Sequence, residues 1–465
     1  MTTTPGTEGP EPSRSEKVLG LRDLYLQLAT APVAEVEQAA SAELAQLLEF
    51  ISANSDWWRD RLGATVALAE GVPLAEAIRS LPITERDTVQ DSAREMRILI
   101  PGTTPSDYVA HATSGATGTP RQVIKHRELY SMARDAITLL EWNWFDRDVS
   151  ATLVAFGAND PDADLLPGSP PLTYLGPASA WCRRGITNRD PGTLLDFLEE
   201  LAPTYLLCNG LTLRLLALEQ LIHPRAIVGL EQVLTLCDRI DASTRALVVE
   251  AFGARICDRY STEEFGIIAL QCPAHDHLHV VAPSFVVEIV DPLGEPCPPG
   301  VAGEVLITSL HDFAQPLIRY QIGDIAQWGA PCDAGITWPV IEAIHGRTRQ
   351  VVTGPTGQPR LVTLVGADFL TLPELLDFRI ALFTDTVVFM GHTREPLTGA
   401  QAQRVERSVR SVFPPGLDYV YLPADASIRE QTWKRSEFDV VDEPFDSDLN
   451  AAEVLERVIG ASSGA

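Results

Sequence analysis

The sequence predicts an α/β protein. A large N-terminal domain has mainly parallel sheets flanked by helices plus a β-rich subdomain, and a small α+β C-terminal domain follows. Three short apolar runs predict buried strands, at Ala151–Phe156, Thr204–Cys208 and Gln232–Leu236. Helical stretches lie between them, at Leu194–Leu201 and Leu211–Leu221. Strands that alternate with helices indicate βαβ units and a largely parallel sheet.

After this region the predicted strands are no longer separated by helical stretches. Val286–Val290 and Glu304–Thr308 read as strands around the turn Asp291–Pro296, which predicts the β-rich subdomain. Near the start, Ala39–Ile51 has apolar residues at helical spacing. We expect a flexible tail over residues 1–16, the large domain over 17–346 and the small domain over 347–465. The last boundary is placed from motif positions, because composition does not mark it.

Composition restricts the function classes. The chain has 465 residues and a net charge of −27, which disfavours nucleic acid and anionic membranes as partners. We expect no transmembrane helix, because no apolar run reaches about 18 residues. The start lacks the pattern of a signal peptide, and seven cysteines do not form a disulfide framework. A soluble, cytoplasmic protein with reduced cysteines is therefore predicted; the oligomeric state is left open.

A glycine-rich loop is the most informative segment. Thr113–Pro120 holds two glycines, three threonines and one serine within eight residues. Glycines let backbone N–H groups converge on an anion, and hydroxyl groups add donors for phosphate oxygens. An ordinary surface turn has a similar composition, and the spacing does not match the Walker A pattern.

A second segment, Asp258–Gly266, follows a predicted strand at Ala254–Cys257 and offers an aromatic ring and two adjacent carboxylates. The ring of Tyr260 is able to stack on a base, and a carboxylate of Glu263 or Glu264 is able to hold Mg²⁺ that bridges phosphates. A solvated acidic turn is the alternative.

Three later segments are Pro316–Asp324, Gly346–Arg347 and Thr432–Phe438. Together these motifs resemble those of the adenylate-forming superfamily, which includes acyl-CoA synthetases, aryl-acid ligases and luciferases. The loop resembles T-S-G-[ST]-T-G-K-P, although Ala116 and Thr119 replace a hydroxyl residue and the lysine. Arg121 or Lys125 is a candidate to supply the missing charge. The matching loop residues, which the resemblance assigns to nucleotide binding, are Thr113, Ser114, Gly115, Thr117 and Gly118.

The resemblance also assigns roles outside the loop. It places Tyr260 beside the adenine, makes Glu264 the Mg²⁺-linked carboxylate, and puts Glu263 where threonine is usual. It implies that Asp324 binds the ribose hydroxyls, although Gln321 replaces an arginine. Arg347 would open the hinge to a mobile C-terminal domain and face the nucleotide, and Lys434 would be the catalytic lysine. Acidic hinge residues are replaced by Arg349 and Gln350.

Within the superfamily, the sequence resembles the phenylacetate–coenzyme A ligase branch through Ser80–Asp87, Ile268–Val280 and Pro298–Glu304. Some members of this branch bind a structural zinc ion through cysteine and histidine residues. The matching residues here are Cys272, His279 and Cys332, while Ala334 replaces a further cysteine. A closed zinc site needs four ligands, so His275 or His277 would have to complete it. A relic without metal is the alternative.

The resemblance implies that a carboxylic acid attacks Mg·ATP to give an acyl-adenylate and pyrophosphate. Coenzyme A is the implied acceptor, with an amine or a carrier-protein thiol as alternatives. Acyl-pocket positions carried over from the family suggest an aromatic acid and comprise Trp142, Trp181, Arg184, Asn209 and Asp238. A catalytically silent nucleotide-binding protein and, more distantly, a kinase-like phosphoryl transferase are the rival functions.

Overall fold

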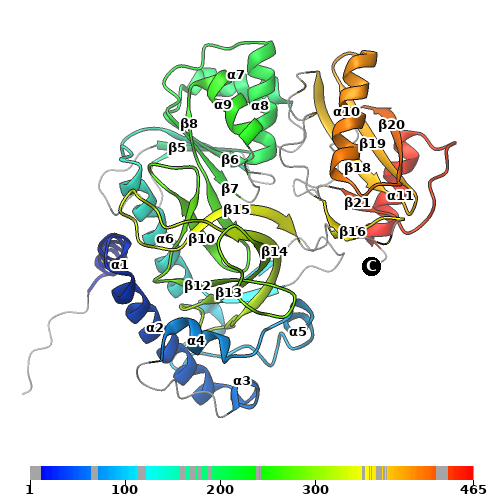
Figure 1. Ribbon diagram of the computed structural model, residues 1–465. Helices are drawn as coiled ribbons and strands as arrows, with labels where there is room; N and C mark the ends of the chain where they lie inside the picture. Colours follow the sequence, from blue (N-terminus) through cyan, green and yellow to red (C-terminus); the bar gives the residue numbers. More distant parts are fainter. Residues whose placement is uncertain are drawn as a thin grey trace, which may run out of the picture.

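The protein is described by a computed structural model, shown as a ribbon in Figure 1. The description covers residues 12–63, 72–112, 122–157, 163–167, 174, 180–185, 190–236, 240, 242–347, 351–355, 357, 359–362, 369, 372, 374–425 and 438–463. No helix in this part of the chain is long and apolar enough to cross a bilayer.

Five helices open the described chain. They are α1 (Arg14–Ala29), α2 (Val33–Asn54), α3 (Asp56–Leu62), α4 (Leu74–Arg79) and α5 (Arg86–Asp91). Helix α1 begins inside the predicted tail because Ser13 and Glu16 form a capping box around its first turn. Helix α2 confirms the helical spacing read at Ala39–Ile51, since Leu44, Leu47, Leu48 and Ile51 are all buried on one face.

A six-stranded sheet confirms the predicted βαβ region. Its order is β4-β5-β3-β6-β7-β8, parallel except for β4. The strands are β3 (Leu153–Gly157), β4 (Ala163–Pro167), β5 (Ala180–Gly185), β6 (Tyr205–Asn209), β7 (Gln232–Leu236) and β8 (Arg255–Cys257). Side chains alternate between the two faces, as the two-residue period of a strand requires. Leu153, Ala155 and Tyr205 belong to one core with helix α6 (Arg127–Trp144), while Val154 and Phe156 belong to another. The helices of that second core are α7 (Pro191–Leu201), α8 (Gly210–Ile222) and α9 (Ala242–Phe252).

The β-rich part is a seven-stranded sheet whose pairings are antiparallel, in the order β12-β13-β14-β15-β11-β10-β9. The strands are β9 (Arg259–Thr262), β10 (Gly266–Gln271), β11 (Leu278–Val280), β12 (Phe285–Val290), β13 (Ala302–Ser309), β14 (Tyr320–Trp328) and β15 (Val340–Arg347). The predicted hairpin is confirmed, with Val290 opposite Glu304 and the side chain of Asp291 accepting hydrogen bonds from the backbone of its own turn. After a short 3-10 turn η2 (Pro105–Asp107), a separate hairpin pairs β1 (Tyr108–Ala112) with β2 (Gln122–His126).

The C-terminal part has its own sheet and core. Its strands are ordered β20-β19-β18-β21, with bounds Asp418–Ala424, Thr386–Thr393, Leu375–Leu382 and Asp439–Val440. Helix α10 (Gly399–Val412) belongs to one of its apolar clusters and α11 (Ala451–Ser463) to the other. Strands β16 (Val351–Thr353) and β17 (Pro359–Leu361) form a small ribbon. In Figure 1 this part lies beside α8. The sequence-based division at residues 346 and 347 stays a prediction.

Candidate active site

The β1–β2 hairpin holds the two ends of the glycine-rich segment side by side. Ala112 and Gln122 are opposite each other in the antiparallel register. The predicted phosphate-binding residues Thr113, Ser114, Gly115, Thr117 and Gly118 lie outside the described residues. The base of the hairpin is described, and the Nδ1 atom of His111 lies 3.9 Å from Glu263 Oε2. The glycine-rich segment therefore begins next to the predicted carboxylate pair.

The turn between β9 and β10 carries Glu263 and Glu264. Its backbone is held by Thr262, whose Oγ1 accepts a hydrogen bond from Phe265 N at 3.3 Å. Glu264 is buried, whereas the Glu263 side chain is 37% exposed. Adjacent carboxylates next to the predicted phosphate loop provide the oxygen ligands that Mg²⁺ prefers, so the donor set fits the predicted ion.

Tyr260 and Asp324 lie together. The Tyr260 hydroxyl donates a hydrogen bond to Asp324 Oδ2 at 2.7 Å, and both residues are buried. Their strands, β9 and β14, are not neighbours in the sheet, so the contact requires a strongly curved sheet. A carboxylate has about four lone-pair sites, so Asp324 is able to bond a ribose diol as well as the phenol.

Arg347 is the last residue of β15, the strand next to β14. It is opposite Asp324 in the β14–β15 register. The described chain thus gathers Tyr260, Glu263, Asp324 and the backbone of Arg347 in or against one curved sheet. Lys434 lies outside the described residues.

The predicted acyl-pocket residues fall into two groups. Trp181 belongs to a row of residues that crosses the parallel sheet near the amino ends of its strands. The other residues of this row are Leu153, Tyr205, Gln232 and Arg255. Trp142 is buried against Tyr205, with ring centroids 5.3 Å apart. Asn209 lies four residues beyond Tyr205 on β6. Four residues of strand span about 13 Å, so the structure does not bring Trp142 together with Asn209.

Arg184 and Asn209 lie toward the carboxyl ends of the strands, where parallel sheets bind ligands. The Arg184 guanidinium stacks 4.1 Å from the ring centroid of Phe197. The Asn209 side chain accepts a hydrogen bond from Thr212 N at 2.8 Å and so caps α8. Asp238 lies outside the described residues.

A second cluster has the composition of a metal site. Ligand atoms of Cys272, His277, His279 and Cys332 all lie within 4.8 Å of one another. The two sulfur atoms are 3.8 Å apart, and the two histidine Nε2 atoms are 3.3 Å apart. His277 therefore takes the fourth position that the sequence left open between His275 and His277. His275 instead contacts Asp333 Oδ1 at 2.6 Å.

The surroundings of this cluster fit a zinc ion. His279 Nδ1 lies 3.1 Å from the Trp338 carbonyl oxygen, which leaves Nε2 facing the other three ligands. Ala274 N and Ala334 N each donate to a cysteine sulfur at 3.4 Å. Burial lowers the pKa of His279 to about 4, which favours the neutral imidazole that binds metals. Two thiols and two imidazoles match the ligand set of closed tetrahedral zinc sites.

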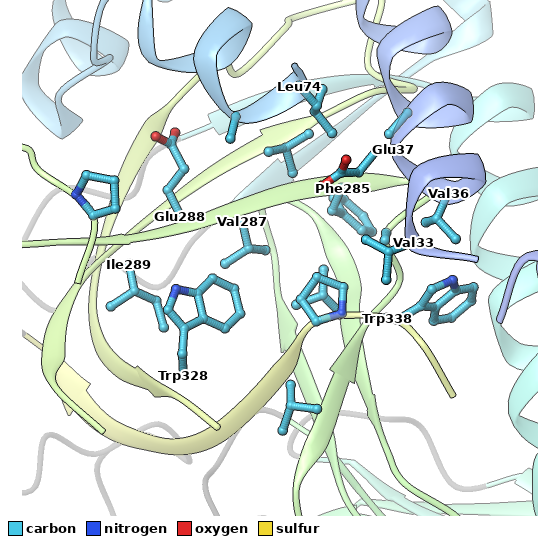
Figure 2. Close-up of a pocket in the computed structure, with 18 of the residues that line it drawn as sticks. Val33, Val36, Glu37, Leu74, Phe285, Val287, Glu288, Ile289, Trp328 and Trp338 are labelled. Carbon is cyan, nitrogen blue, oxygen red and sulfur yellow. The ribbon is translucent and has the colours of Figure 1, made fainter. Parts of the chain in front are cut away.

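An apolar cavity of about 520 Å³ lies elsewhere, between α2, α4 and the outer strand β12 (Figure 2). Its walls include Val36, Phe285, Trp328 and Trp338. None of the described residues predicted for nucleotide, acyl or metal binding lines this cavity. The candidate active site therefore stays at the Tyr260–Asp324 pair.

Comparison with known proteins identifies the family of the chain. Residues 68–311, just over half of the chain, match the sequence profile of the family described as AMP-binding enzyme. The chain belongs to this family, and it is therefore an enzyme of the adenylate-forming superfamily. It is on the phenylacetate–coenzyme A ligase-like branch. The phenylacetate–coenzyme A ligase of Thermus thermophilus is 25% identical over 375 residues, which cover 75% of this chain and 78% of that protein.

Two solved structures establish the fold. A 2-hydroxyisobutyryl-CoA ligase in its postadenylation state gives a TM-score of 0.68 at 16% identity, over 99% of this chain and 98% of that one. An anthranilate–CoA ligase in complex with anthranoyl-AMP gives 0.52 at 14% identity, over 78% and 73% of the two chains. The predicted α/β fold is thereby confirmed.

Proposed function

We propose that this enzyme activates a carboxylic acid with Mg·ATP and transfers the acyl group to coenzyme A. The observation that carries the proposal is the hydrogen bond between Tyr260 and Asp324, together with the approach of His111 to Glu263. These contacts gather residues from three separated motifs at one place. The names of the relatives support an acid–thiol ligase, and they include both aromatic and aliphatic acids.

Two displacements complete the reaction. An oxygen of the acid forms a bond to the α-phosphorus of ATP, the bond to the β,γ-phosphate unit breaks, and pyrophosphate leaves. The sulfur of coenzyme A then attacks the acyl carbon, its proton is released, and AMP leaves. Mg²⁺ at Glu264 would neutralise phosphate charge in the first step.

The chain's own residues position the reactants. Asp324, oriented by Tyr260, binds the ribose, and the loop Thr113–Pro120 would hold the phosphates. Lys434 neutralises charge that develops during attack. Arg347 lies at the start of a separate small domain, residues 347–465, that carries this lysine.

For the substrate we propose an aromatic acid, bound toward the carboxyl ends of the parallel strands. The phenylacetate and anthranilate ligases among the relatives support an aromatic ring. Arg184 and Asn209 lie toward this edge, whereas Trp142 and Trp181 lie near the amino ends of the strands, so these two tryptophans are the weaker candidates among the described pocket residues.

The test is ATP–pyrophosphate exchange with a panel of aryl and alkyl acids, followed by addition of coenzyme A or amines. Exchange that depends on an aryl acid, with thioester formation, is the expected result. Release of ADP would indicate a kinase, and absence of exchange with every acid would favour a silent nucleotide-binding protein.

Lys434→Ala provides the first mutational prediction. Removing the ammonium should abolish adenylation, whereas the dissociation constant for ATP should change little, because the charge acts in the transition state. Single-turnover adenylation and equilibrium binding measure the two quantities. Unchanged adenylation would remove Lys434 from the mechanism.

We further propose that Cys272, His277, His279 and Cys332 hold a structural zinc ion. The ion would join the turn before β11 to the segment between β14 and β15, and it has no part in the acyl transfer.

A further inference from the structure

Lys125 is a buried cation close to the candidate active site. Its side chain has no exposed surface, and its ammonium forms an ion pair with the nearly buried carboxylate of Asp312. The ammonium also lies 5.9 Å from the ring centroid of Tyr130 and 5.7 Å from that of Phe265. Removing an ammonium and a carboxylate from water is costly, and pairing repays this cost only when the geometry is good. Stability alone therefore does not account for a buried pair at this place.

One side of the pair is joined to the glycine-rich hairpin. Lys125 is on β2, the strand that leaves the glycine-rich segment. The preceding residue, Ile124, donates its N–H to Gln315 Oε1 at 3.0 Å, and Gln315 is fully buried. Asp312 and Gln315 belong to the connection that leads into β14, the strand of Asp324. Strand β2 of the hairpin is therefore held against the connection that leads into β14.

The other side of the pair lies under the carboxylate turn. Phe265 directly follows Glu264, and its ring contacts the Lys125 ammonium. The Tyr130 hydroxyl lies 3.1 Å from the point where a Cβ atom would stand on Gly266, whose φ is +73°. The Tyr130 ring is also 4.8 Å from the His111 ring, which approaches Glu263. One ammonium thus contacts rings packed against both ends of the Glu263–Gly266 turn.

We infer that Lys125 and Asp312 are positioning residues of the nucleotide site. The buried pair fixes the hairpin base and the Glu263–Gly266 turn relative to each other. The groups that contact phosphate and metal are therefore held in position before the nucleotide binds. Lys125 does not supply the charge that Thr119 removes from the loop, because its ammonium is buried on Asp312. The functional consequence rests on the proposed function, whereas the structural coupling does not.

The experiment compares the double variant Lys125→Met/Asp312→Asn with the wild-type protein. The double variant leaves no unpaired buried charge, so it should fold even where Lys125→Met alone does not. We expect backbone amides in both 122–126 and 259–266 to exchange with deuterium about tenfold faster without nucleotide. The KM for Mg·ATP should rise about tenfold with kcat less affected.

The control is Glu288→Gln, which removes one partner of the largely buried ion pair between Glu288 on β12 and Arg319, the residue before β14. It should lower the melting temperature without faster exchange in either segment and without a change in KM. The inference would be overturned if either segment of the double variant exchanged at the wild-type rate. It would also be overturned if the control showed faster exchange in both segments and a raised KM. A wild-type protein that never adenylates an acid would contradict the proposed function alone, since the exchange measurement needs no nucleotide.

Discussion

At the residue scale, the phenol of Tyr260 and the carboxylate of Asp324 orient each other. The hydrogen bond is 2.7 Å long and both side chains are buried, so few other arrangements are open to them. Tyr260→Phe should keep the fold but raise the KM for ATP about tenfold, because a hydrogen bond to a charged group contributes roughly 1.5–3 kcal/mol. The value of kcat should change less, since the proposed ribose contact would be present before and during the reaction.

A matched control is available in Tyr205→Phe. The Tyr205 hydroxyl accepts a hydrogen bond from Asp148 N at 2.8 Å, near the amino ends of the parallel strands. Its removal should lower the melting temperature and leave the KM for ATP unchanged. If both variants alter KM equally, the Tyr260 contact has no special part in nucleotide binding.

At the element scale, a metal ion would join segments that are far apart in the chain. Cys272 and His277 lie on either side of the turn between β10 and β11, and Cys332 lies in the connection between β14 and β15. We expect one zinc ion per chain by elemental analysis of the purified protein. His277→Ala should lose most of this zinc and lower the melting temperature, because a structural site needs all four ligands.

His275→Ala separates a ligand from a neighbour. This histidine contacts Asp333 and is not one of the four clustered residues, so its variant should retain zinc and stability. Equal loss of zinc in both variants would contradict the ligand assignment, and a metal-free wild-type protein with unchanged stability would contradict the site itself.

The elements themselves were largely predictable from sequence. Gln232–Leu236 is a short run with three buried central residues, and its length of five residues favours the strand β7 over a helix. The choice between His275 and His277 was not predictable, because residues two apart share one face of an extended chain. The bond between Tyr260 and Asp324 was also hidden, since it depends on how seven strands curve in space. Trp142 was placed by its position in the family, whereas the face of α6 on which it lies directs it to Tyr205.

At the scale of the whole molecule, Arg394 joins the C-terminal part to α8. Its Nη2 donates to Glu219 Oε2 at 2.6 Å, and its Nη1 lies 3.3 Å from His223 Nδ1. Burial opposes ionisation of Glu219, but hydrogen bonds from Arg394, His223 and Arg225 outweigh it and lower the pKa of the carboxyl group. Partly exposed pairs of this kind contribute about 0.2–1 kcal/mol, enough to shift a two-state equilibrium up to about fivefold.

Arg394→Ala should therefore let the C-terminal part move more freely relative to α8 without unfolding either part. Spin labels on α7 and α10 should show a broader distance distribution in this variant than in the wild-type protein. Arg410→Ala is the control, because Arg410 pairs with Glu406 within α10. A distance distribution that is identical in Arg394→Ala and wild type would show that the Arg394 contact does not restrict the position of the C-terminal part relative to α8.

The pairing of Asp324 with Arg347 in adjacent strands has a mechanical consequence. The strand β15 ends at the same rung that carries Asp324, the proposed ribose ligand. A swing of the C-terminal part about this strand end would pull on that rung, so reorientation and release of AMP would be one coupled event. The point about which the C-terminal part swings would then also respond to whether nucleotide is bound.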